Sequence, residues 1–382
     1  MIETLSRPEA DEPLAQKAIV KTRKVRLYTE AEPFRFEVGA KLGPVDVAFE
    51  TYGELNEERT NCILVCHALT GSAHAAFYNS ETDRVPGWWD GVIGPGKALD
   101  STKYFVVCSN FLVGCYGTTG PSTINPRTLK EYGTSFPVTT IRDMVRIQKK
   151  LLEWLGVEKV QLVIGGSMGG MQAIEWAVMY PDFVERAAPI ATGASHTAWG
   201  IGLNEVARQA IFNDPSYRNG DYYPYGQPSR GLALARMIAM LSYRSPESFT
   251  LRFQRDRMRE GGDRDFFDLK NIFQAESYLH YQGVKLVERF DANTYVYITR
   301  AMDLHDVAHG RGKLRDVLGT IKSKVLCIGI SSDVLYPAVE QRGLSELIPS
   351  AKYAEIYSVH GHDAFLIEFE KTNKIIEEFL KD

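Results

Sequence analysis

Short apolar runs, separated by longer segments of mixed polarity, set the pattern of this chain of 382 residues. Near the amino end, residues 26–29 and 34–38 alternate apolar and polar positions, which predicts half-exposed strands, and 45–52 is a further strand candidate. Later runs are almost continuously apolar, as in strands that are buried on both faces; they cover 62–66, 104–108, 160–164, 187–191, 324–330 and 353–357. These runs predict a mainly parallel sheet.

Helical segments stand between several of these runs. They cover 141–155, 168–180 and 368–380, and Pro181 ends the second of them. Alternation of buried strands with helices is typical of the α/β class. We therefore expect an α/β fold with a mostly parallel central sheet.

One long interval interrupts this alternation. Between residues 195 and 320 no run resembles a buried strand. Three stretches within it have helical character: 204–212, 231–242 and 246–259. We expect a mostly helical insertion over 195–320, between the two halves of one core, 24–194 and 321–382. Residues 1–23 are polar and are expected to form a flexible arm.

Composition and charge exclude several classes of protein. The 44 basic and 48 acidic residues leave a net charge of −4, which offers no general attraction to nucleic acid or to an anionic membrane. No apolar stretch is long enough to span a bilayer, and the first residues lack the apolar core of a signal peptide. We expect a cytoplasmic protein with neither nucleic-acid nor membrane partners.

The cysteines agree with this expectation. There are five, an odd number, and no two of them form a C-x-x-C pair, so we expect free thiols in a reducing compartment. No second pair of cysteine or histidine residues stands at the spacing of metal ligands. We therefore expect no bound metal.

The first candidate for chemistry is the motif Gly165-Gly166-Ser167-Met168-Gly169, which fits G-x-S-x-G. It follows a buried-strand run and precedes a helical run, which is the context of a nucleophile elbow. Such an elbow strains the serine backbone, and glycines two positions to either side are needed because side chains there would collide. The non-catalytic alternative is a glycine-rich turn that happens to contain a serine.

A nucleophilic serine needs a base and a group that orients the base. In this fold the chain order is serine, acid, histidine. His360 and His362 both follow the last strand run; we favour His362, although the residues alone leave His360 open. Asp333 follows the run 324–330, at the edge where open α/β sheets carry their sites. Its alternative reading is an aspartate that begins a turn.

Acyl transfer also needs two N–H donors for the developing oxyanion. The backbone of Met168, directly after the serine, should supply one. The loop 67–74 follows the strand run 62–66, and we expect the second donor at the backbone of Leu69. An ordinary strand-to-helix connection is the alternative reading of this loop.

Arg236 is a candidate of a different kind. It is the lone charged residue of the apolar stretch 231–241. A buried, unpaired charge is costly, so this arginine needs a partner. The partner is either an acid elsewhere in the insertion or the carboxylate of a substrate, which a guanidinium can hold with two hydrogen bonds.

Together with further blocks, these residues resemble the homoserine O-acetyltransferase family, whose members are acyltransferases with the α/β-hydrolase fold. The resemblance extends from about residue 24 to the carboxyl end. It is carried by the blocks 67–71, 87–90, 93–96, 117–121, 165–172, 204–209, 289–293 and 361–366. Jointly these blocks are far more specific than G-x-S-x-G alone.

The resemblance implies a two-step, ping-pong reaction. Ser167 would take the acetyl group of acetyl-CoA, with His362 as base and Asp333 behind it, and the hydroxyl of L-homoserine would then attack the acyl-enzyme. The backbone N–H groups of Leu69 and Met168 would hold the oxyanion. Acetyl-CoA is a co-substrate in this scheme, and no cofactor is expected.

The resemblance also implies substrate contacts and an assembly. Arg236 would bind the homoserine carboxylate and Asp363 its amino group. The insertion 195–320 would be the family's helical lid, which shapes a tunnel to Ser167 and carries the contact of a homodimer. The pathway implied is methionine biosynthesis.

Alternatives remain at this stage. Close relatives use succinyl-CoA as donor or serine as acceptor; no lysine or arginine lies between Arg59 and Arg84 to meet a succinyl carboxylate, which favours acetyl. Water can replace the acceptor, as in a serine esterase or thioesterase. A hydrolase fold that binds a partner without catalysis is the alternative from another class.

Overall fold

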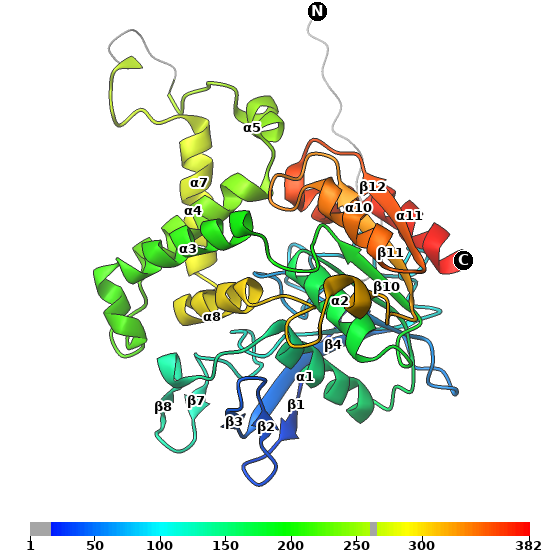
Figure 1. Cartoon of the computed structure of the whole chain (residues 1–382). Helices are drawn as coiled ribbons and strands as arrows, with labels where there is room; N and C mark the ends of the chain where they lie inside the picture. The colour runs from blue at the N-terminus through cyan, green and yellow to red at the C-terminus, as the bar shows by residue number, and fades with distance from the viewer. Residues whose placement is uncertain (1–16, 260–265) are drawn as a thin grey trace, which may run out of the picture.

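A sheet of eight strands forms the centre of the protein (Figure 1). The computed structural model describes residues 17–259 and 266–382. From edge to edge the strands are β1 (Arg23–Tyr28), β4 (Val45–Tyr52), β6 (Phe105–Ser109), β5 (Cys62–Val65), β9 (Val160–Gly166), β10 (Arg186–Ile190), β11 (Lys324–Ile330) and β12 (Ala351–Ile356). The pairs β1–β4 and β4–β6 are antiparallel and all other pairs are parallel. The prediction of an α/β fold with a mostly parallel sheet is confirmed.

The central strands are apolar throughout because their alternate side chains enter two different cores. On β5, Cys62 and Leu64 join the core on one face, and Ile63 and Val65 join the core on the other. The first face is covered by α1 (Ile141–Trp154), α2 (Met168–Met179) and α10 (Ala338–Leu347), and the second by α11 (Phe369–Lys381). Of these four helices, α10 has no counterpart in the sequence prediction.

One predicted strand needs correction. The segment 34–38 does not continue as a strand; β2 (Phe34–Arg35) pairs with β3 (Lys41–Leu42) in a separate two-stranded ribbon. The chain reverses between them, with a hydrogen bond of 2.9 Å from Phe36 N to the carbonyl of Ala40 and a positive φ of 86° at Gly39. The apolar side chains of Phe34 and Phe36 still reach the core, which explains the alternating pattern. A second ribbon joins β7 (Ile124–Asn125) to β8 (Lys130–Glu131), just before the short helix η1 (Gly133–Ser135).

The predicted flexible arm also differs from the structure where it is described. Residues 1–16 lie outside the described residues. Residues 17–23 lie against the core: Val20 is buried, and its N–H donates to the carbonyl of Tyr78 at 2.8 Å. Lys17 Nζ donates to the carbonyl oxygens of Glu81 and Asp83. These contacts order the end of the arm before β1 begins.

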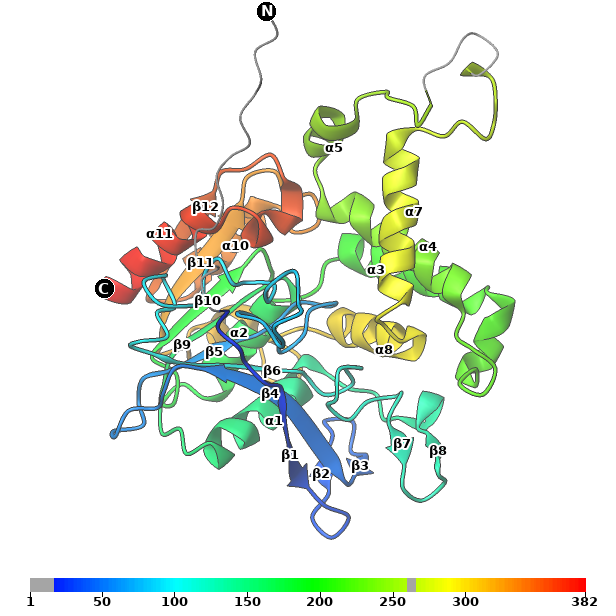
Figure 2. The ribbon, with the colours of Figure 1, turned by 180° about the vertical axis from the view of Figure 1, so that it is seen from behind.

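Most helices of the segment 195–320, called the lid below, gather at one side of the core (Figure 2), whereas Leu318 of the last one joins a core cluster with Ile174 and Val325. They are α3 (Ala198–Phe212), η2 (Pro215–Gly220), α4 (Ser229–Tyr243), α5 (Pro246–Phe253), α7 (Gln274–Val287), α8 (Ala292–Asp303) and α9 (Leu314–Leu318). Helix α5 ends earlier than predicted. Helices α7 and α8 were not predicted. Within the described residues, no helix is long and apolar enough to cross a membrane.

The two connections between lid and core run side by side. The N–H of His196 donates to the carbonyl of His305, and the N–H of Val307 donates to that of Ala194, both at 2.9 Å. The lid is therefore inserted at a single place in the core; α3 begins beside this place and α8 ends beside it.

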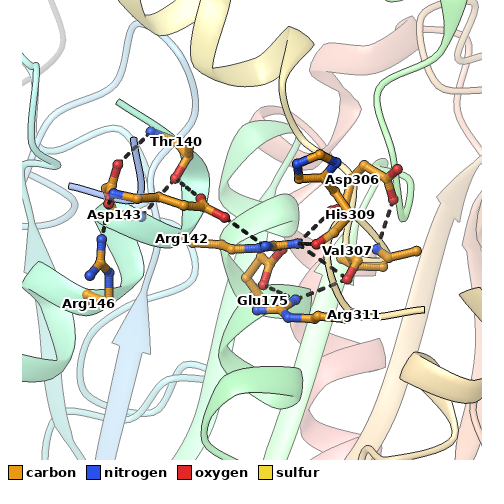
Figure 3. A network of polar contacts seen from close by, with 11 residues as sticks. Thr140, Arg142, Asp143, Arg146, Glu175, Asp306, Val307, His309 and Arg311 are labelled. Atoms are coloured by element: carbon orange, nitrogen blue, oxygen red, sulfur yellow. Dashed lines mark hydrogen bonds and ion pairs between the residues drawn. The ribbon is translucent and has the colours of Figure 1, made fainter. Parts of the chain in front are cut away.

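An ion-pair network around the buried carboxylate of Glu175 fixes the returning connection to the core (Figure 3). Arg142 on α1 contacts Glu37 at 2.7 Å and Glu175 on α2 at 3.1 Å, and it donates to the carbonyl oxygens of Asp306 and His309 at 2.9 Å. Arg311, from the same connection, reaches the second oxygen of Glu175 at 2.7 Å. Since α2 begins just after Ser167, the helix behind the serine and the base of the lid share one anchor.

Candidate active site

Ser167 occupies the sharp turn between β9 and α2. Its φ of 59° and ψ of −125° are unfavourable for a residue with a side chain, so the surrounding structure must hold this conformation. One restraint is the hydrogen bond of 2.9 Å from its N–H to the carbonyl of Ile190 at the end of β10. This geometry is the strained elbow that the motif predicts.

The glycines of the motif are required by close backbone contacts. A Cβ on Gly165 would lie 2.4 Å from the carbonyl oxygen of Cys66, and one on Gly169 would lie 2.1 Å from the same oxygen. These distances are far below contact distance, so neither position accepts a side chain without displacing the end of β5. The tight fit brings the loop after β5, which contains Leu69, close to the serine.

Asp333 and His362 lie together beyond the ends of β11 and β12. Asp333 Oδ2 is 2.6 Å from His362 Nδ1, and its other oxygen accepts hydrogen bonds from the N–H groups of Leu335 at 2.8 Å and Tyr336 at 2.9 Å. Both Asp333 and His362 are buried. The carboxylate thus holds one ring nitrogen of His362, and it is itself held by two backbone donors.

The structure pairs His362, and not His360, with Asp333. His362 lies on the short helix η3 (Gly361–Leu366), and its Nε2 is buried without a hydrogen-bond partner in the described part of the chain. Burial by itself lowers the pKa of this imidazole, but the charge and the hydrogen bond of Asp333 outweigh burial, and the pKa is raised. An imidazole with one nitrogen fixed and the other free can accept a proton from a nearby hydroxyl.

A small, narrow pocket has Ser167 in its wall. The core contributes Leu69 and Leu335, and the lid contributes most of the remaining wall, including Tyr243 from α4 and Tyr295 from α8. Helices of the lid therefore cover the pocket at Ser167. The exposed fraction of Ser167 is 6%, so bulk water has little access to this residue.

His196, which sequence reasoning did not single out, also lines this cavity. Both of its ring nitrogens have partners: Nδ1 lies 2.9 Å from the hydroxyl of Tyr336, and Nε2 lies 3.1 Å from the amide nitrogen of Asn204. Burial lowers its pKa to about 4, so it stays neutral. Because both nitrogens are engaged, His196 joins the lid to the core and does not compete with His362 as a base.

The two N–H groups predicted to bind the oxyanion have no hydrogen-bond acceptor among the described residues. Within the described residues, neither Leu69 N nor Met168 N donates a hydrogen bond. Met168 is the first residue of α2, so its N–H lies at the positive end of the helix dipole. Two free donors beside a serine elbow can bind a negatively charged oxygen.

Arg236 lies on α4 without an acidic partner. No carboxylate lies within 4.0 Å of it among residues 17–259 and 266–382, and its Nε is buried without a hydrogen bond. Its guanidinium carbon lies 5.4 Å from the ring centre of Tyr243. Among the described residues, the alternative of an ion pair inside the lid is therefore not realised; Glu260, Asp263 and Asp265 lie outside them.

Asp363 follows His362 on η3, and its carboxylate has the opposite charge to Arg236. Arg244 Nε, from the residue after α4, lies 3.4 Å from its Oδ2. Sequence reasoning missed both Tyr243 and Arg244. The spacing in the sequence could have indicated Tyr243, because it stands seven residues after Arg236 and hence on the same face of the helix.

The described residues contain no group of three or more possible metal ligands. All five cysteines are free, and four are buried: Cys62, Cys66, Cys108 and Cys327. Burial raises the pKa of each of these four thiols. They are therefore poor nucleophiles, and Ser167 remains the candidate for that role.

Comparison with known proteins identifies the family. The family model of the α/β hydrolase fold matches residues 61–369. Homoserine O-acetyltransferase of Carboxydothermus hydrogenoformans is 51% identical over 367 residues, which are 95% of this chain and 96% of that protein. The crystal structure of homoserine O-acetyltransferase from Bacillus anthracis has a TM-score of 0.88 at 34% identity and covers 96% of this chain and 98% of its own.

Esterase E22 is also similar, with a TM-score of 0.86 at 31% identity over 95% of this chain and 100% of that chain. The fold is thus shared by proteins named as transferases and as esterases, and it does not separate the two activities. Sequence identity near one half over almost the whole length does identify the family. The chain belongs to the homoserine O-acetyltransferase family of the α/β-hydrolase fold.

Proposed function

We propose that this protein transfers an acetyl group from acetyl-CoA to the hydroxyl of L-homoserine through an acyl-serine intermediate. The observation that carries the proposal is the pair of unlike charges, Arg236 and Asp363, near the triad residue His362. Among the described residues, Arg236 has no acidic partner within 4.0 Å, and Asp363 accepts no hydrogen bond, although Arg244 Nε lies 3.4 Å from its Oδ2. An amino acid acceptor brings one carboxylate and one ammonium group, which complement this pair.

In the first half-reaction, Ser167 Oγ attacks the thioester carbon while His362 Nε2 takes its proton. The tetrahedral intermediate carries its negative charge on the former carbonyl oxygen, which the N–H groups of Leu69 and Met168 stabilise. When the intermediate collapses, the carbon–sulfur bond breaks, and CoA leaves as a thiol with the proton from His362. Asp333 keeps the imidazole oriented and stabilises its charged form throughout.

In the second half-reaction, the homoserine hydroxyl attacks the acetyl-serine ester and gives its proton to His362. Collapse of this intermediate breaks the bond to Ser167 Oγ, which recovers the proton. Arg236 binds the carboxylate of the acceptor and Asp363 its ammonium group, so the hydroxyl is held near the ester. We propose no bound cofactor, because both substrates and the triad supply all the groups that react.

The lid supports transfer over hydrolysis in this scheme. It contributes most of the cavity wall around Ser167, and the serine is largely shielded from solvent. A transferase must keep water from its acyl-enzyme, which would otherwise be lost by hydrolysis. The small cavity favours a short acyl group, and the absence of a basic residue between Arg59 and Arg84 is consistent with acetyl.

A screen of donors and acceptors tests the proposed function directly. Acetyl-CoA and succinyl-CoA are each combined with L-homoserine, with L-serine or with no acceptor, and the release of CoA thiol is followed together with the acylated product. We expect turnover with acetyl-CoA and homoserine to exceed every other combination by at least about tenfold in kcat/KM. Faster turnover with succinyl-CoA or with serine would assign another activity of the same family.

An esterase is the second candidate, since esterase E22 has a closely similar structure. The same screen separates it from a transferase. Sustained release of CoA without any acceptor, at the rate seen with homoserine, would mean that water takes the acyl group. A single burst of CoA followed by a slow phase is expected instead, because the acyl-enzyme waits for its acceptor.

We further propose that the protein forms a homodimer through the lid and acts in the cytoplasm, in methionine biosynthesis. The support for the dimer is a set of exposed apolar side chains on lid helices: Val206, Leu234, Leu241, Tyr281 and Val284. The support for the compartment is five free cysteines, which suit a reducing environment.

Light scattering coupled to size exclusion should give twice the chain mass of 42.9 kDa for the native protein. The variant Leu234→Glu should shift the protein to the monomer, because a charge would be buried in the interface. Val339→Glu is the matched control, since Val339 is 70% exposed on α10, in the core. A monomeric native protein, or a dimer that tolerates glutamate at 234, would contradict this assembly.

A further inference from the structure

The lid contacts the loop of the catalytic histidine where helix α4 ends. Ser245 Oγ donates a hydrogen bond to the carbonyl of Val359. A Cβ on Gly361 would lie 2.5 Å from the nitrogen of Ser245 and 2.7 Å from the carbonyl carbon of Arg244. The two chain segments are therefore in direct backbone contact, and Arg244 is held in a defined position relative to η3.

Asp363 lies in this contact as a carboxylate with unused hydrogen-bonding capacity. Its side chain is 18% exposed, and no N–H or O–H group of the described residues donates a hydrogen bond to it. Arg244 Nε lies 3.4 Å from Oδ2 but makes no hydrogen bond to any of the described residues. The two groups thus attract each other as charges, and the carboxylate keeps free acceptor sites. A largely buried carboxylate of this kind suits a ligand with several N–H donors.

Charged and titratable groups face Asp363 from both the lid and the core. They are Arg236, Tyr243 and Arg244 of the lid and Asp333 and His362 of the core. Burial raises the pKa of the Asp363 carboxyl, and Arg244 is the strongest of the groups that oppose this shift. The ionised form of Asp363 therefore depends on a residue that the lid supplies.

We propose that Arg244 is a positioning residue of the acceptor site, which orients Asp363 and maintains its negative charge for the ammonium group of the acceptor. This inference rests on the proposed function, in which Asp363 binds that group. Arg244 does not reach the reacting atoms in this scheme, so the first half-reaction does not require it. Selection of an acceptor with a free amino group then depends on the lid as well as on the core.

The variant Arg244→Met tests this, because methionine keeps much of the apolar stem and loses the charge. The KM for L-homoserine should rise by about fivefold at pH 7 and by more at pH 6. The acidic limb of kcat/KM for homoserine should move to higher pH by roughly one unit, because binding needs the ionised carboxylate and is lost as pH falls through its pKa. Arg244→Lys should restore most of the affinity.

A merely structural role would have a different signature. The first-turnover release of CoA from acetyl-CoA should stay within about twofold of the wild type in Arg244→Met. Arg252→Met, at an exposed arginine on α5, is the matched control and should change neither quantity. An unchanged KM and pH profile would overturn the inference, and so would an equal slowing of CoA release. Failure of the proposed function itself would look different, because the wild type would not acetylate homoserine.

Discussion

Replacement of Ser167 by alanine should abolish the release of CoA from acetyl-CoA, with a fall in rate of roughly four orders of magnitude or more. The nucleophile is removed, while His362, Asp333 and the two oxyanion donors remain in place. Without an oxygen on this side chain, no acyl-enzyme can form. A thiol reagent measures the released CoA, and mass spectrometry of the intact protein measures the added acetyl group, which should appear on the wild type and be absent from Ser167→Ala.

Ser109→Ala provides the matched control. Ser109 is 1% exposed, and its hydroxyl has no hydrogen-bond partner in the described part of the chain, so its loss should leave activity and melting temperature nearly unchanged. If Ser167→Ala still released CoA at the wild-type rate, the covalent mechanism would be wrong. A folded but inactive Ser167 variant beside an active Ser109 variant is the expected pair of results.

Replacement of Arg236 by alanine should raise the KM for L-homoserine by roughly a hundredfold or more. The guanidinium has no acidic partner within 4.0 Å among the described residues, so its removal leaves none of their carboxylates unpaired. What is lost is the charge-assisted contact with the acceptor carboxylate. Steady-state kinetics with varied homoserine measure this effect, while the first-turnover release of CoA should be spared.

Two comparisons make this result specific. The amide of homoserine lacks the carboxylate, so the wild type should prefer homoserine strongly over the amide, and Arg236→Ala should lose that preference. Arg230→Ala, at an exposed position of the same helix, should behave as the wild type. Equal losses in both half-reactions of Arg236→Ala would instead indicate that the arginine maintains the fold of the lid.

The central sheet could be predicted because its signal is local. Strands buried on both faces are apolar at every position, and the runs over 62–66, 160–164 and 324–330 correspond to β5, β9 and β11. The prediction of a strand over 34–38 was wrong because it, too, used only the local pattern. Alternation of Phe34 and Phe36 reports burial of two side chains, and it does not report whether the chain continues as a strand or reverses at Gly39.

The lid was harder to predict in detail. Helices α7 and α8 carry apolar and polar side chains in mixtures that no simple stripe describes, as in the sequence of 274–287. Their stability comes from packing against other helices, and packing of this kind is absent from a local window of sequence. The insertion itself was visible only as a long interval without buried strands.

For the candidate site, too, the local features could be predicted from the sequence and the contacts between distant segments could not. The α/β class and the strand–turn–helix context that makes Ser167 an elbow could both be predicted, because they depend on neighbours in the chain. The pairing of His362 with Asp333, the lack of an acidic partner for Arg236 among the described residues, and the contact of Arg244 with Asp363 all depend on the tertiary structure. These contacts join segments that lie far apart in the sequence. Which of several charged side chains meet is set by how the lid packs on the core, and no local pattern of residues encodes that packing.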